Sequence, residues 1–75
     1  MKRTTQFTAV IEREGDMFVS LCPQLDIASQ GLSVEEAKSN LKEAIELFFE
    51  TASQTEIDSR FHSEVFITQV EVSLA

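Results

Sequence analysis

The stretch from Gly31 to Ala52, GLSVEEAKSNLKEAIELFFETA, constrains the fold more than any other part of the chain. Ser33 and Glu36 have the spacing of a capping box, in which both side chains accept hydrogen bonds from free backbone N–H groups at the helix start. Apolar residues then recur at i, i+3, i+4 and i+7 along one helical stripe: Val34, Ala37, Leu41, Ala44, Ile45, Phe48 and Ala52. The pattern predicts one long amphipathic helix whose apolar stripe needs a second layer to cover.

Four short segments have strand patterns and can supply that layer. Residues 6–14 alternate apolar and polar side chains, residues 17–22 and 26–30 follow, and residues 64–73 form the longest β-branched run. A second capping-box spacing, Ser53 to Glu56, predicts a shorter helix over residues 54–61. The expected order is therefore β-β-β-α-α-β.

The first two strands should form a hairpin around Gly15, which can supply the positive φ of a tight turn. A three-residue loop, Glu14 to Asp16, would gather one apolar face for the helix: Phe7, Ala9, Ile11, Met17, Val19 and Leu21. A two-residue loop would instead shift the register and turn one strand over. We prefer the three-residue loop because it makes a single apolar face.

These elements predict an α+β domain with one main helix on one face of the sheet. A right-handed crossover would bring the last strand beside the first and parallel to it, giving the spatial order 3-2-1-4. No linker, repeat or low-complexity tract divides the sequence, so we expect one domain over residues 1–75.

The charge balance narrows the possible partners. Asp and Glu number 13 against 6 Lys and Arg, a net charge of −7, which argues against nucleic acid as a direct partner. A basic protein partner fits better, although an acidic surface can serve solubility alone. The lone cysteine, Cys22, fits a reducing cytoplasm, and no apolar run suggests a signal peptide or a membrane span.

No residue pattern predicts an enzyme, a metal site or a cofactor. His62 is the only histidine and has the sequence context of an exposed loop residue. A carboxylate pair for two-metal nucleic-acid hydrolysis would need inward-facing acids on neighbouring strands, and Glu12 and Glu14 lie only near a strand end. Neither metal-ligand spacing nor a glycine-rich phosphate loop occurs.

Several apolar residues lie outside the predicted core and point to self-association. A sheet covered on one side should be mostly polar on the other, so apolar groups there suggest an interface. We expect a homodimer or larger homo-oligomer, since so small a domain buries only about 60% of its unfolded surface. The expected interface residues are Val10, Phe18, Val65 and Ile67 on the outer sheet face, with Leu47 off the helix stripe.

The combination of motifs resembles the HicB-like antitoxin family over nearly the whole chain. The matching features are Ile11-Glu12, the hairpin Gly15, Cys22-Pro23-Gln24-Leu25, Ser29-Gln30-Gly31, and a capped helix reading Glu35-Glu36-Ala37 through Asn40-Leu41-Lys42-Glu43-Ala44-Ile45-Glu46-Leu47. The closing VFITQVEVSLA also looks like the last strand of short, single-domain members.

The resemblance implies a partial ribonuclease-H-like fold that lacks the catalytic carboxylates. It also implies an antitoxin that binds and masks HicA, a small basic mRNA-cleaving toxin. Many family members carry an additional DNA-binding domain, which we do not expect in residues 1–75. The acidic residues that we expect to meet the toxin are Asp26 and, on the exposed helix face, Glu35, Glu43, Glu46 and Glu50. A free-standing oligomeric or sensing module without a toxin, and a minor enzyme, are the alternatives.

Overall fold

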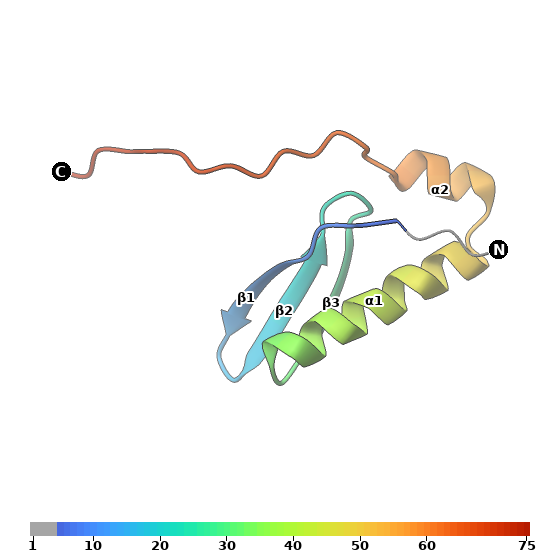
Figure 1. Cartoon of the computed structure of the whole chain (residues 1–75), viewed down its shortest axis with the longest axis horizontal. Helices are drawn as coiled ribbons and strands as arrows, with labels where there is room; N and C mark the ends of the chain where they lie inside the picture. Colours follow the sequence, from blue (N-terminus) through green and yellow to red (C-terminus); the bar gives the residue numbers. More distant parts are fainter. Residues whose placement is uncertain (1–4) are drawn as a thin grey trace.

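The computed structural model describes residues 5–75, which form a three-stranded antiparallel sheet, two helices and an extended tail (Figure 1). The strands are β1 (Val10–Glu14), β2 (Met17–Cys22) and β3 (Ile27–Gly31), in the spatial order β1-β2-β3. Helix α1 (Val34–Thr51) covers one face of the sheet and is followed by the short helix α2 (Gln54–Arg60). The predicted α+β class, both helices and the first three strands are confirmed, although the first strand begins at Val10 and not at residue 6.

Both helices begin at the capping serines that the sequence predicts. At the start of α1, the Ser33 hydroxyl accepts a hydrogen bond from the Glu36 N–H at 3.0 Å. The Glu36 carboxylate in turn accepts from the Leu32 N–H at 2.8 Å. At α2, the Ser53 hydroxyl accepts from the Glu56 N–H at 3.2 Å. These bonds satisfy backbone donors that have no partner within the helix.

The β1–β2 hairpin has a two-residue loop, so the expected three-residue loop is wrong. Glu14 pairs with Met17, and Gly15 has φ +62°, as the first central position of a type II′ turn requires. Since alternate residues of a strand share a face, Phe18 lies on the same side of β2 as Ser20, whose hydroxyl bonds α1. The expectation that Phe18 lies on the outer sheet face is therefore wrong.

The other consequence of the register concerns the outer face of the sheet. Residues expected to point toward α1 lie outside instead: Met17, Val19 and Leu21, alongside Val10 and Glu12. The helix-facing side of β1 and β2 carries Ile11, Arg13, Phe18, Ser20 and Cys22. The hairpin thus shows more apolar surface to solvent than the sequence pattern predicts.

The core lies between α1 and the β2–β3 half of the sheet. Cys22, Leu25 and Leu41 are fully or almost fully buried, and Phe7, Ile27, Ile45 and Phe48 pack around them. The Ser20 hydroxyl, also fully buried, donates to the Ala37 carbonyl at 2.9 Å. Because α1 packs mainly on β3 and β2 and touches β1 little, the β1 side of the helix stays open.

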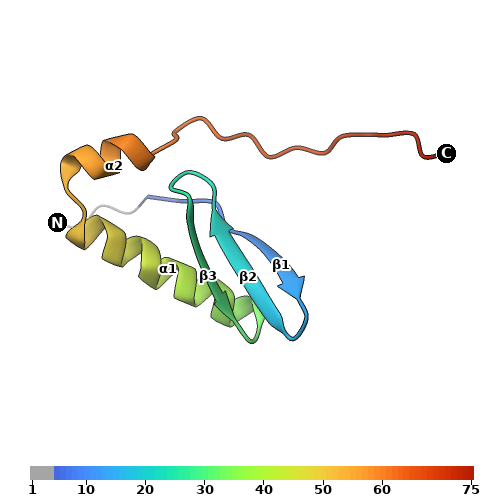
Figure 2. The ribbon, with the colours of Figure 1, turned by 180° about the vertical axis from the view of Figure 1, so that it is seen from behind.

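Residues 61–75 form neither helix nor strand and run away from the body as an extended tail (Figures 1 and 2). The expected fourth strand, residues 64–73, is not part of the sheet, so the order 3-2-1-4 is not found in the described residues. The tail's apolar side chains are exposed, with Phe66 at 84% and Leu74 at 89%. Alternation of apolar and polar residues shows that a segment can form a strand. Which sheet edge the strand joins depends on residues that are distant in sequence.

Candidate interaction surfaces

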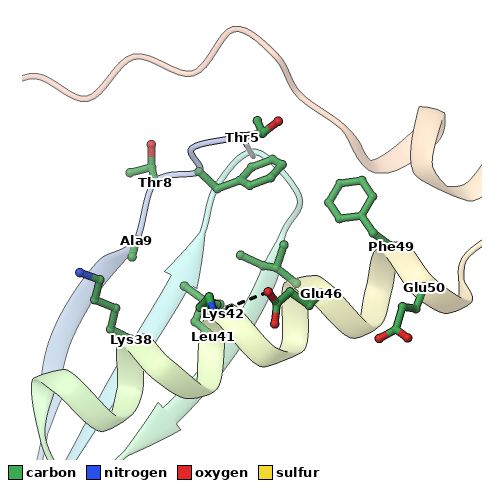
Figure 3. A pocket seen from close by; sticks show the side chains of 11 residues that line it. Thr5, Thr8, Ala9, Lys38, Leu41, Lys42, Glu46, Phe49 and Glu50 are labelled. Carbon is green, nitrogen blue, oxygen red and sulfur yellow. Dashed lines mark ion pairs between the residues drawn. The ribbon is translucent and has the colours of Figure 1, made fainter. Parts of the chain in front are cut away.

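An open groove lies between the segment that precedes β1 and helix α1 (Figure 3). Its apolar floor is formed by Phe7, Ala9, Leu41, Ile45 and Phe49. Thr5, Thr8, Lys38, Lys42, Glu46 and Glu50 surround this floor. An apolar floor with a charged rim is the usual composition of a protein-binding surface.

A cluster of phenylalanine rings closes one end of the groove. The Phe7 ring lies 5.7 Å from that of Phe49 and 6.1 Å from that of Phe61, measured between centroids. Phe49 in turn meets Phe48 edge-on at 5.5 Å. Phe49 is 39% and Phe61 44% exposed, so the cluster joins three segments while leaving ring surface open to solvent.

Gln24 ties the groove to the start of the tail. Its side-chain oxygen accepts from the Thr8 N–H at 3.1 Å, and its side-chain nitrogen donates to the Thr8 hydroxyl at 2.7 Å. Its backbone carbonyl accepts from the His62 N–H at 2.7 Å. The tail therefore leaves the body beside the segment that enters β1.

Strand β1 is an open edge of the sheet. In the part of the chain that the structure describes, β1 pairs with β2 alone. A two-residue hairpin closes on a hydrogen-bonded pair, here Glu14 and Met17, and bonded pairs then alternate along the ladder. The backbone N–H and C=O groups of Ile11 and Arg13 consequently face away from β2. Such an edge is a template for a further strand.

The acidic residues expected to meet a toxin do not form one site. All of them are exposed, and four share one side of α1: Glu35, Glu43, Glu46 and Glu50. Glu46 is 3.6 Å from Lys42 in an exposed ion pair. Asp26 lies in the β2–β3 turn, at the opposite end of the sheet from the start of α1 (Figure 1). Its carbonyl accepts from the Arg60 guanidinium at 3.0 Å.

The residues expected to form an oligomer interface are also scattered. Val10 is 42% exposed on the outer sheet face, Leu47 is 59% exposed on α1, and Ile67 is 62% exposed on the tail. Val65 is half-buried, and Phe18 belongs to the helix side of the sheet. The larger exposed apolar surface is the other face of the tail, which carries Phe66, Val70, Val72 and Leu74.

The described residues show few features of a catalytic or metal site. Within residues 5–75, no group of three or more His, Cys, Asp or Glu side chains is placed to hold a metal ion. Cys22 is fully buried and His62 is exposed. Neither α1 nor α2 is long and apolar enough to cross a membrane. The distinctive surfaces of the described residues are the groove, the β1 edge, the acidic side of α1 and the apolar tail.

The chain matches no protein-family model, and comparisons with curated proteins and with solved structures give no significant match.

Proposed function

We propose that this protein is a HicB-like antitoxin that binds a small basic mRNA-cleaving toxin of the HicA type and masks its RNA site. The sequence motifs quoted above suggest the family. The structural observation that carries the proposal is the acidic side of α1, where Glu35, Glu43, Glu46 and Glu50 are all exposed. With a net charge of −7, the chain has the potential to attract a basic partner.

Electrostatic attraction and apolar contact would have separate roles in this complex. The glutamates would steer a basic toxin toward α1 and speed association, since complementary potentials act mainly on the rate of encounter. At the rim of the adjoining groove, Phe49, which is 39% exposed, would supply apolar contact together with Leu47, which is 59% exposed on α1. Glu46 and Glu50 belong to both surfaces, because they line the groove and lie on the acidic side. A toxin held there would have its cationic RNA-binding surface covered.

The proposal includes a larger sheet than the three strands described above. Residues 64–73 would add to β1 as a parallel fourth strand, giving the order 3-2-1-4 of a trimmed ribonuclease H core. The alternation of apolar and polar residues in the segment supports this arrangement. We also propose that the protein acts in the cytoplasm, has no nuclease activity, and binds neither a cofactor nor nucleic acid directly.

The decisive experiment measures the rate of association with a basic toxin encoded beside the gene. We would compare the wild type with a variant carrying Glu43→Gln, Glu46→Gln and Glu50→Gln, at about 0.05 and 0.15 M salt. Surface charges are screened over about 8 Å at the higher salt. The variant should associate roughly tenfold more slowly at low salt, and the difference should shrink as salt rises.

A matched control variant separates the effect of the charges on α1 from the effect of the net charge. Glu12→Gln, Glu56→Gln and Glu71→Gln remove the same number of charges from exposed positions outside the acidic side of α1. This control should associate within about twofold of the wild type. Equal rates for all three proteins would remove the electrostatic argument. Failure of the wild type to bind the toxin at micromolar concentration would refute the proposed function.

The second candidate is a free-standing oligomeric module with a structural or sensing role. The exposed apolar tail and the outer sheet face favour it, because neither needs a toxin as partner. Absence of a basic, HicA-sized reading frame beside the gene would support this alternative over the antitoxin.

A further inference from the structure

The tail has the pattern of a strand with one strongly apolar face. Side chains of one parity are Phe66, Thr68, Val70, Val72 and Leu74, and those of the other parity become polar at Gln69, Glu71 and Ser73. Phe66, Val70, Val72 and Leu74 are between 68% and 89% exposed. Scattered single apolar residues on a surface are ordinary, but a continuous row of this size on an extended segment marks an interaction.

The body of the protein offers a surface that fits such a strand. The free backbone groups of Ile11 and Arg13 on the β1 edge can pair with an added strand. Beside that edge, the groove between the start of β1 and α1 has the half-buried Phe7 and Ile45 on its floor, with the buried Leu41 beneath them. A strand added to β1 with its apolar face toward α1 would extend over this groove, while its polar face points outward.

The connection to the body opposes docking of the tail on its own chain. The His62 N–H is bonded to Gln24, and Arg60 is held by the Asp26 carbonyl, so the chain is fixed immediately before the tail. Residues 61–75 contain neither glycine nor proline to make a sharp turn. Figures 1 and 2 show the tail running away from β1 rather than along it. A short, constrained hinge favours exchange of an element between two copies.

We propose that two copies of this chain exchange their tails, each placing residues 64–73 on the β1 edge and groove of the other. The exchange completes both sheets with four strands and buries two apolar rows and two edges at once. It does not depend on the proposed toxin, and a failure of toxin binding would leave it unaffected.

The first test uses the full chain at several concentrations. Sedimentation equilibrium should give a dimer mass at about 0.5 mM. In a mixture of ¹³C-labelled and unlabelled protein, isotope-filtered nuclear Overhauser spectra detect only contacts between copies. The methyl groups of Val70 and Val72 should show such contacts with Leu41 or Ile45. A monomer at this concentration would overturn the proposal, as would a dimer whose tail contacts appear only within one copy.

A pair of variants tests which face of the tail is buried. Val70→Asp places a charge on the apolar face, and both exchanged strands of the dimer then carry it. We expect the dimer dissociation constant to rise by about 100-fold or more, since a buried, unpaired carboxylate is strongly unfavourable. Gln69→Asp adds the same charge one residue away on the polar face and should change the constant by less than about threefold.

Both substitutions lie on a part of the chain that contributes little to the folded body, so misfolding cannot imitate the result. Val70 is 79% exposed in the single chain, and circular dichroism of both variants should match the wild type at concentrations where the wild type is monomeric. Equal dissociation constants for Val70→Asp and the wild type would show that the association uses another surface. Equal weakening by both variants would show a general charge effect and would also overturn the exchange.

Discussion

Replacing Gly31 by alanine should destabilise the protein, because the last residue of β3 lies against the first turn of α1. A Cβ atom built at Gly31 would come within 2.6 Å of the Ala37 nitrogen and 2.8 Å of the Glu36 carbonyl carbon. It would also lie 2.9 Å from the Glu36 Cβ. Two of these three atoms belong to the backbone, so a side-chain rotation cannot relieve the clash. The helix start has to move away from the sheet.

The size of the effect follows from two opposing terms. Overpacking of this kind typically costs about 1–3 kcal/mol, and the backbone contacts place Gly31→Ala toward the upper end. Alanine has less conformational freedom than glycine in the unfolded chain, and this alone would raise the free energy of unfolding by about 0.4–1 kcal/mol. The net loss is about 2 kcal/mol, against a total unfolding free energy of roughly 4–11 kcal/mol for a domain of this size. The melting temperature should fall by roughly 10 °C.

Gly15→Ala provides the matched control. Gly15 has φ +62°, and a Cβ atom added there would have no neighbour within 4 Å, so its substitution incurs backbone strain of about 1 kcal/mol without any clash. Urea unfolding followed by far-ultraviolet circular dichroism measures both changes, since the chain has neither Trp nor Tyr. If Gly31→Ala is no more destabilising than Gly15→Ala, the close approach of β3 and α1 does not limit the fold as argued.

Three further predictions concern side-chain hydrogen bonds. Ser33→Ala should lower the unfolding free energy by about 1 kcal/mol through loss of the cap, whereas Ser39→Ala on the exposed middle of α1 should not lower it; equal losses would contradict the capping role. Ser20→Ala should cost about 1 kcal/mol in urea unfolding, because the buried hydroxyl bonds a carbonyl of α1, and an unchanged midpoint would refute this. Gln24→Ala should cost about 1–2 kcal/mol and speed amide hydrogen exchange at Thr8; unaltered exchange there would show that the link does not hold the segment before β1.

The helices could be predicted closely because their signals are local. The predicted helical stretch, residues 31–52, contains the observed Val34–Thr51, and both capping serines bond as the spacing indicates. The hairpin loop could not be predicted as securely. A change of one residue in loop length reverses a strand's faces, and the apolar pattern of Met17, Val19 and Leu21 favoured the wrong choice. One of the two buried residues on that strand, Ser20, is polar and its hydroxyl bonds α1, which no period-two pattern reveals.

The tail shows a different limit of sequence reasoning. Its residues alternate as a strand should, and the segment is extended, yet it pairs with no strand among the described residues, because alternation does not specify a pairing edge. The requirement for glycine at position 31 is likewise a tertiary effect. Its backbone angle is ordinary, and the reason for glycine is the close approach of α1. Asp26 was grouped with the helix glutamates by charge alone, and charge carries no information about position.

Cys22, fully buried at the centre of the core, gives the protein an internal reporter of its own opening. A thiol reagent can reach this sulfur only when the core opens, so the labelling rate at low reagent concentration measures the population of open molecules. Because the chain has a single cysteine, the signal needs no engineering and no background correction. Labelling at increasing protein concentration would then distinguish an opening that requires dissociation of two copies from one that occurs within each copy.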